Sequence, residues 1–171
     1  MVAPLVSVIL PTLGRGDSLQ KALESLNRQS YVRWELILVT DVGPLARLRN
    51  EGATRAKGNI LAFTEDDVFL SPGWLSGVVA GFQDPSVGGV SGPCTIPSAF
   101  RNNRDLFRYQ LIKHLYDWLF LDGRAHLPGH ITRAGAWTTG ANEEGCSYQG
   151  EVDFLEACNM SWRKEAFWQV G

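Results

Sequence analysis

Three adjacent carboxylates, Glu65, Asp66 and Asp67, are the residues of this sequence best suited to chemistry. They come directly after residues 60–63, a short apolar run without alternation, which is typical of a strand buried on both faces of a parallel sheet. Neighbouring carboxylates repel one another, and a divalent cation relieves that repulsion; hard oxygen ligands suit Mg²⁺ or Mn²⁺. Ligands of open α/β sheets bind just outside the carboxyl ends of the strands. A cation site and a solvated acidic turn without a ligand are both consistent with this run.

The elements that must position these carboxylates follow a β-α-β-α-β order, which predicts right-handed crossovers and a parallel sheet. Apolar runs rich in β-forming residues predict strands at residues 5–10, 34–39 and 60–63. Between the first two strands, Asp17 is expected to cap a helix, with Gln20 as the return partner of a capping box.

The second helix is expected to open at Pro44 and to end at Gly58, which is placed to be its left-handed residue. Ser71 and Pro72 are expected to begin a third helix. The remaining signals predict a glycine-rich strand at 87–92, an amphipathic helix from about 105 to 121, a long loop over 122–150, a short strand at 151–155 and a last helix capped by Ser161.

Length and composition are those of a single globular domain, with 171 residues, 44% apolar and 20% charged. The net charge of -2 gives no indication of binding to nucleic acid or to an anionic membrane. Cys94, Cys146 and Cys158 lie far apart, match no metal-binding spacing and favour a reducing compartment over a disulfide framework. The sequence shows neither a secretory signal nor a membrane-spanning apolar run, so a cytoplasmic protein is predicted.

Several motifs follow one another along the chain: Val-Ser-Val-Ile-Leu-Pro-Thr at 6–12, Glu-Leu-Ile-Leu-Val-Thr-Asp at 35–41, the Arg-Asn, Gly, Ala and Gly positions within 49–58, Phe-Thr-Glu-Asp-Asp at 63–67, Trp-Leu at 74–75 and Cys-Asn-Met-Ser-Trp-Arg-Lys at 158–164. Their order and spacing, across nearly the whole chain, resemble family 2 glycosyltransferases, which have the GT-A fold. The chain departs from the family at residues 13–14, where an asparagine is usual, and at Thr40, which replaces the first of two aspartates. Glu65 stands for the first aspartate of the metal motif.

The resemblance implies an α/β protein with a mostly parallel, Rossmann-like sheet flanked by helices in three layers, α/β/α. It implies one domain over residues 1–171, with a nucleotide-sugar-binding half at 1–93 and an incomplete acceptor-side half at 94–171. The implied activity is that of a metal-dependent, inverting glycosyltransferase. Such an enzyme moves a sugar from a nucleotide-diphosphate-sugar donor to a saccharide or lipid-linked acceptor.

The resemblance also implies roles for single residues. Asp67 would hold Mg²⁺ or Mn²⁺, while Glu65 and Asp66 would lie against the ribose or share the metal. The further roles are Asp41 as acceptor from a base N–H, Pro11 or Thr12 in the base pocket, Arg49 at the base or the diphosphate, and Asn159 on the acceptor side.

Each of these roles has a plainer alternative. Arg49 could simply cover its helix, Asp41 could only cap a turn, and Asn159 could bond to the local backbone. Trp137 lies in a glycine-rich stretch, where it could stack on an acceptor sugar or pin a loop.

The family places its general base beyond the position that matches Gly171, so the chain is expected to be truncated at its C-terminus. Asp153 and Glu156 are the only acids near the acceptor-side motif, and both are weak candidates for a substitute base. The alternative function is therefore a nucleotide-sugar-binding module that lacks the base. A third hypothesis is a nucleotidyltransferase, but the motif at residues 159–163 argues against it. Peripheral association with the inner membrane face would come through the missing C-terminal part.

Overall fold

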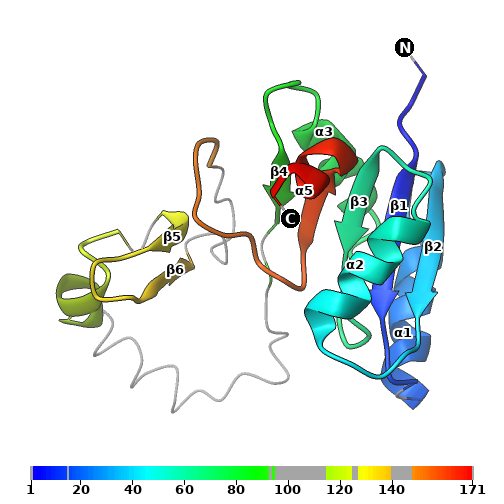
Figure 1. The fold of residues 1–171 in the computed structure, drawn as a ribbon, viewed down its shortest axis with the longest axis horizontal. Coiled ribbons are helices and arrows are strands. Elements are labelled where there is room, and N and C mark those ends of the chain that lie inside the picture. Colours follow the sequence, from blue (N-terminus) through cyan, green and yellow to red (C-terminus); the bar gives the residue numbers. More distant parts are fainter. Residues whose placement is uncertain are drawn as a thin grey trace. The chain divides into compact units, whose positions relative to one another are not determined.

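The computed structural model describes residues 2–14, 16–92, 94, 115–124, 127–139 and 148–170. The chain divides into two compact units (Figure 1). The first consists of Met1–Ser91 together with Ala157–Gly171, and the second of Gly92–Glu156. The C-terminal segment thus groups with the N-terminal part of the chain, and the predicted functional halves divided at residue 93 stay a prediction.

The first unit contains a five-stranded sheet in the order β2-β1-β3-β7-β4. The strands are β1 (Val6–Pro11), β2 (Trp34–Val39), β3 (Ile60–Phe63), β4 (Gly89–Ser91) and β7 (Met160–Arg163). Strand β1 pairs in parallel with both β2 and β3, and β7 runs antiparallel to β3 and β4. The mostly parallel sheet of an α/β protein is therefore confirmed.

Strand β7 corrects the prediction that Ser161 caps the last helix. Ser161 lies inside the strand, opposite Ala62 of β3, and its side chain is buried. The last helix, α5 (Lys164–Val170), begins only after the strand ends. A four-residue strand with two polar positions has no local signature, because it is stabilised by pairing with a strand about a hundred residues earlier.

Helices cover both faces of the sheet, as the three-layer prediction requires. Helices α1 (Gly16–Asn27) and α3 (Trp74–Gly81) pack on the face that carries Val6, Val8 and Leu10 of β1. Helices α2 (Leu45–Arg55) and α5 pack on the other face, against Ile9. Phe167 of α5 stacks on Phe63 of β3, with ring centroids 5.4 Å apart. Because successive strand residues point to opposite faces, the wholly apolar β1 and β3 contribute to both cores.

The helix starts differ from the predicted ones. Helix α1 begins at Gly16, so Asp17 lies in its first turn, and Gln20 Nε2 donates to Glu24 instead of closing a capping box. Helix α3 begins at Trp74 after Gly73, without a side-chain cap, so the 71–72 pair precedes the helix. Pro44 directly precedes α2, in agreement with a helix-opening proline.

Gly58 is needed for space and not for a left-handed backbone. Helix α2 ends at Arg55 and is followed by Ala56 in an extended conformation. The Gly58 N–H donates to Ser7 Oγ at 2.8 Å. A Cβ atom on Gly58 would lie 2.5 Å from the Leu5 carbonyl oxygen and 2.7 Å from Ser7 Oγ. The turn before β3 therefore passes too close to β1 for any side chain.

Ser7 belongs to a polar network that links β1, β2 and this turn. Its hydroxyl donates to Glu35 Oε1 at 2.7 Å, and the Lys57 N–H donates to the same oxygen at 2.6 Å. Burial raises the pKa of Glu35, but the hydrogen bonds from Ser7, Lys57 and Gly58 and the Lys57 charge outweigh it, so the pKa lies below its usual value of 4.5.

The second unit contains a hairpin where the sequence predicted a long loop. Strands β5 (Pro128–Ile131) and β6 (Trp137–Thr139) pair antiparallel, whereas residues 151–155 form no strand. Residues 115–120 are helical, which agrees with the end of the predicted 105–121 helix; residues 105–114 lie outside the described part. Of the helices described in either unit, none has the length and apolar content to cross a membrane.

Replacing Gly58 by alanine should destabilise the protein by about 1–3 kcal/mol, the usual cost of forcing atoms into a well-packed site. Gly77 is the matched control, because it lies exposed in α3 with no atom within 4 Å of an added Cβ. Gly77→Ala should stabilise by about 0.5–1 kcal/mol through helix propensity. Urea unfolding of both variants measures this, and equal effects of the two would show that Gly58 is not tightly packed.

Replacing Glu35 by glutamine should lower stability near neutral pH. A lowered pKa in the folded state means that ionised Glu35 contributes stability above its unfolded pKa, and that this contribution is lost as pH falls through the folded pKa. The difference between wild type and Glu35→Gln should therefore shrink below about pH 4.5. Urea midpoints between pH 3 and 8 measure it, with the exposed Glu24→Gln as control; a pH-independent difference would contradict the network's role.

Candidate functional site

The carboxyl ends of three parallel strands meet at one edge of the sheet. Thr12 follows β1, Asp41 follows β2 closely and Glu65 follows β3 closely. The register of β1 and β3 ends with Ile9 beside Phe63, and three residues further along each segment the side chains of Thr12 and Asp66 are hydrogen-bonded. The predicted donor-side residues are thus brought to the edge where ligands of open α/β sheets bind.

Asp66 is held by a buried hydrogen bond. Thr12 Oγ1 donates to Asp66 Oδ2 at 2.7 Å, and both residues are buried. The Gly14 N–H in turn donates to Thr12 Oγ1 at 2.9 Å. Thr12 therefore uses its hydroxyl to fix a carboxylate and the turn after β1.

Glu65 is paired with Arg49 of α2. The Arg49 Nη2 atom lies 2.9 Å from Glu65 Oε1, and it also donates to the Ala157 carbonyl oxygen at 3.0 Å. The Arg49 side chain is only 12% exposed, and its Nε is buried without a partner in the described part of the chain. Arg49 therefore does more than cover its helix, because it links α2, the end of β3 and the segment before β7.

Asp67 differs from its two neighbours. Its side chain is exposed, and it makes no hydrogen bond or ion pair with any residue that the structure describes. Within the described ranges, no group of three or more His, Cys, Asp or Glu side chains could enclose a metal ion. Asp67 is thus an exposed carboxylate that is open to an external ligand.

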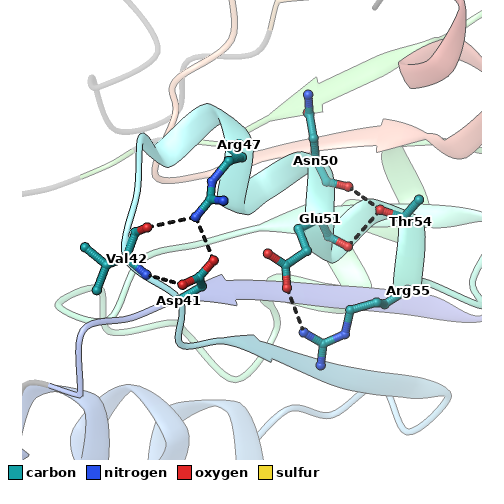
Figure 2. Close-up of polar contacts among 7 residues, drawn as sticks. All are labelled: Asp41, Val42, Arg47, Asn50, Glu51, Thr54 and Arg55. Carbon is teal, nitrogen blue, oxygen red and sulfur yellow. Dashed lines mark hydrogen bonds and ion pairs between the residues drawn. The ribbon is translucent and has the colours of Figure 1, made fainter.

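Asp41 caps the turn that follows β2 (Figure 2). Its Oδ1 accepts from the Val42 N–H at 2.8 Å, and its Oδ2 accepts from Arg47 Nη2 at 2.6 Å. Arg47 also donates to the Val42 carbonyl oxygen. These contacts match the turn-capping alternative for Asp41. The carboxylate is still 56% exposed, and each oxygen has a second lone pair that a ligand could use.

Other polar contacts in Figure 2 are internal to α2. Glu51 and Arg55 form an (i, i+4) ion pair at 3.6 Å, and the Thr54 hydroxyl donates to the carbonyl oxygens of Asn50 and Glu51. Exposed pairs of this kind contribute little free energy.

Asn159 bonds to a side chain and not to the local backbone. Its Oδ1 accepts from the indole Nε1 of Trp74 at 2.7 Å, and its carbonyl oxygen accepts from Ser91 Oγ at 2.8 Å. In the sequence, Trp74 stands out only as part of the Trp-Leu motif at 74–75. The contact spans 85 residues, so no local pattern could have indicated it.

Three predicted residues belong to the second unit. Trp137 is 68% exposed, with its ring 6.1 Å from that of Phe154. Asp153 Oδ2 accepts from the Ile131 N–H at 2.9 Å and lies 3.8 Å from His130 Nδ1, so this carboxylate helps to hold the β5–β6 hairpin. Glu156 is half-buried.

A pocket of about 440 Å³ lies at the opposite end of β3 from the carboxylates. It is lined by the turn before β3 and the start of α5, with Lys164 and Arg163 among its residues. Lys164 Nζ donates to the Ala56 carbonyl oxygen, and Arg163 donates to carbonyl oxygens of residues 82, 84 and 87. Both cations thus hold the segments that follow α2 and α3.

Comparison with known sequences identifies one family. Residues 42–170 match the family described as Glycosyl transferase family 2. The uncharacterized protein MT1568 of Mycobacterium tuberculosis is 31% identical over 120 residues, which cover 56% of this chain and 38% of that protein. The uncharacterized glycosyltransferase YwdF of Bacillus subtilis is 28% identical over 94 residues, or 41% of this chain and 35% of that protein. The chain thus spans less than two fifths of the length of these relatives.

Among solved structures, the mannosyltransferase PcManGT from Pyrobaculum calidifontis, in complex with GDP-Man and Mn²⁺, resembles the whole chain. The TM-score is 0.59 at 16% sequence identity, and the match covers 100% of this chain and 48% of that one. At this identity the likeness is one of fold.

Removing the Thr12 hydroxyl should leave the buried Asp66 carboxylate without its donor. Thr12→Val should therefore destabilise the protein by about 1–3 kcal/mol, whereas Thr12→Ser keeps the hydroxyl and should cost less. Urea unfolding of the two variants measures the difference. Equal stability of the valine and serine variants would contradict the bond.

Proposed function

We propose that this chain, which belongs to glycosyl transferase family 2 and has the predicted GT-A fold, binds a nucleotide-diphosphate sugar. The sugar is then transferred to an acceptor hydroxyl. One observation carries the proposal. Of the three carboxylates after β3, two are fixed by partners from distant parts of the chain, and Asp67 is left open at the ligand-binding edge of the sheet.

Asp67 is the proposed ligand of Mg²⁺ or Mn²⁺. One exposed carboxylate is compatible with such an ion, because magnesium-type sites are commonly formed by one or two carboxylates with substrate phosphates and water. When bound, the ion supplies charge neutralisation to the leaving diphosphate. The Mn²⁺ and GDP-Man held by the structurally similar PcManGT support the assignment.

The fixed carboxylates have a positioning role in this proposal. Asp66, held by Thr12, sets the backbone that carries Asp67, while its other oxygen is available to a ribose hydroxyl or the metal. Glu65 fixes the Arg49 guanidinium, whose charge attracts the donor phosphates. Pro11 lines the base pocket at the end of β1.

Asp41 is proposed to accept a hydrogen bond from the base. The Arg47 and Val42 contacts fix the carboxylate before any nucleotide arrives, which lowers the entropic cost of binding.

The transfer itself is proposed to be an inverting displacement, in which the acceptor hydroxyl attacks the anomeric carbon, the bond from that carbon to the diphosphate oxygen breaks, and a carboxylate takes the hydroxyl proton. A saccharide or lipid-linked acceptor is the proposed second substrate, and Trp137 stays its predicted contact. A second candidate function is donor binding without transfer. Asp153, a weak candidate base, already accepts a hydrogen bond from the Ile131 N–H, which occupies part of its carboxylate. Turnover with donor and acceptor separates the two functions.

Replacing Asp67 by asparagine should abolish the metal-dependent part of nucleotide binding. We expect UDP or GDP to raise the melting temperature clearly with Mn²⁺ and only weakly without it, because a ligand that binds the native state adds stability by mass action. Asp67→Asn should unfold like the wild type without ligand, since the exposed Asp67 has no described partner to lose.

The matched control is Asp17→Asn, an exposed carboxylate in the first turn of α1. It should bind nucleotide and Mn²⁺ as the wild type does. If Asp67→Asn behaves like this control in calorimetry, the metal assignment is wrong.

A further inference from the structure

The bond between Trp74 and Asn159 fixes the orientation of a side-chain amide. An indole N–H can only donate, so the Asn159 atom that faces Trp74 must be Oδ1, at the observed 2.7 Å. The amide nitrogen, Nδ2, consequently points away from Trp74. It makes no hydrogen bond with any described residue, and it is not among the buried atoms that lack a partner, so it reaches the surface.

The backbone at Asn159 is fixed as well. Its carbonyl oxygen accepts from Ser91 Oγ at 2.8 Å, and the next residue, Met160, pairs with Phe63 of β3. Asn159 is only 9% exposed. Its one accessible donor is therefore held rigidly at the end of β3 that leads into Glu65, at the same edge of the sheet as the carboxylates.

We propose that Trp74 is a positioning residue, which holds the Asn159 amide so that Nδ2 donates to an oxygen of the bound nucleotide sugar. This inference rests on the proposed function, since it assumes that a donor occupies this edge. The recognised chemistry is an oxygen acceptor, either of the diphosphate or of the sugar. Trp74 acts only through Asn159, because its own N–H is already used.

A purely structural role makes a different prediction. If the bond only joins α3 to β7, its loss lowers stability and leaves ligand affinity unchanged. If it orients the amide, its loss lowers affinity, because an unrestrained amide can turn its oxygen toward the ligand oxygen.

A double-mutant cycle separates these roles in the full chain. Trp74→Phe keeps an aromatic ring of smaller size but deletes the indole N–H, and Asn159→Ala deletes the amide. Calorimetry with UDP and GDP in the presence of Mn²⁺ should show each single variant binding about two- to tenfold more weakly than wild type, the range for one hydrogen bond. The double variant should bind no more weakly than Asn159→Ala, because Trp74 acts through the amide. Trp168→Phe is the control for the ring exchange, since its indole lies in α5 and is 44% exposed.

The substitution Asn159→Asp adds a further readout. It keeps an oxygen for the Trp74 N–H but replaces the amide donor by an oxygen, so thermal stability should be retained while affinity falls. Loss of affinity already for the nucleoside diphosphate identifies a phosphate oxygen; loss only for the corresponding sugar nucleotide identifies a sugar oxygen. Unchanged affinity of Trp74→Phe for both ligands overturns the inference.

An NMR measurement tests the bond without any ligand. The indole N–H signal of Trp74 is identified by its absence in Trp74→Phe, and it should shift and exchange faster in Asn159→Ala. An unaltered signal overturns the inference while leaving the proposed function intact. If wild type binds neither UDP nor GDP with Mn²⁺, the proposed function fails and the inference fails with it.

Discussion

Electrostatic repulsion among three consecutive carboxylates is the constraint that organises this edge of the sheet. Two of them are relieved by donors from elsewhere in the chain: Asp66 by the Thr12 hydroxyl, 54 residues earlier, and Glu65 by the Arg49 guanidinium, 16 residues earlier. The third, Asp67, is left to solvent. The fold therefore reduces the repulsion only partly, and the remaining charge lies on the exposed Asp67.

This arrangement depends on the parallel pairing of β1 with β3. The register that places Ile9 beside Phe63 also places Thr12 beside Asp66, so a shift of one residue would face the wrong side chain toward the buried carboxylate. The register is set by the two apolar cores, because β1 and β3 are buried on both faces. Gly58 supports the same pairing of β1 with β3, because the turn it occupies lies against β1 directly before β3 begins.

Strands that are marked by a local apolar run were predicted correctly from the sequence. Features that depend on residues far apart in the chain were missed. The strands at 34–39 and 60–63 are continuous apolar runs, and both were found at their observed positions. Strand β7 was missed because Ser161 resembles a helix cap, and its strand conformation comes from pairing with Ala62. At the site, the carboxylates were visible as a run, but their division into two fixed and one open residue depends on Thr12 and Arg49 and has no signature in the run itself.

Segment 157–159 ties the last part of the chain to the edge of the sheet where the three carboxylates lie. Arg49 of α2 binds the Ala157 carbonyl oxygen, and Trp74 of α3 binds the Asn159 side chain. These helices lie on opposite faces of the sheet, so the segment is held from both sides before β7 begins. The Arg49 nitrogen that holds Ala157 is also the one that holds Glu65. A change in the charge around Glu65, such as the arrival of a cation or a diphosphate, therefore acts on the same guanidinium that positions the entry to β7. Arg49 thus links Glu65 to the segment that leads into Asn159.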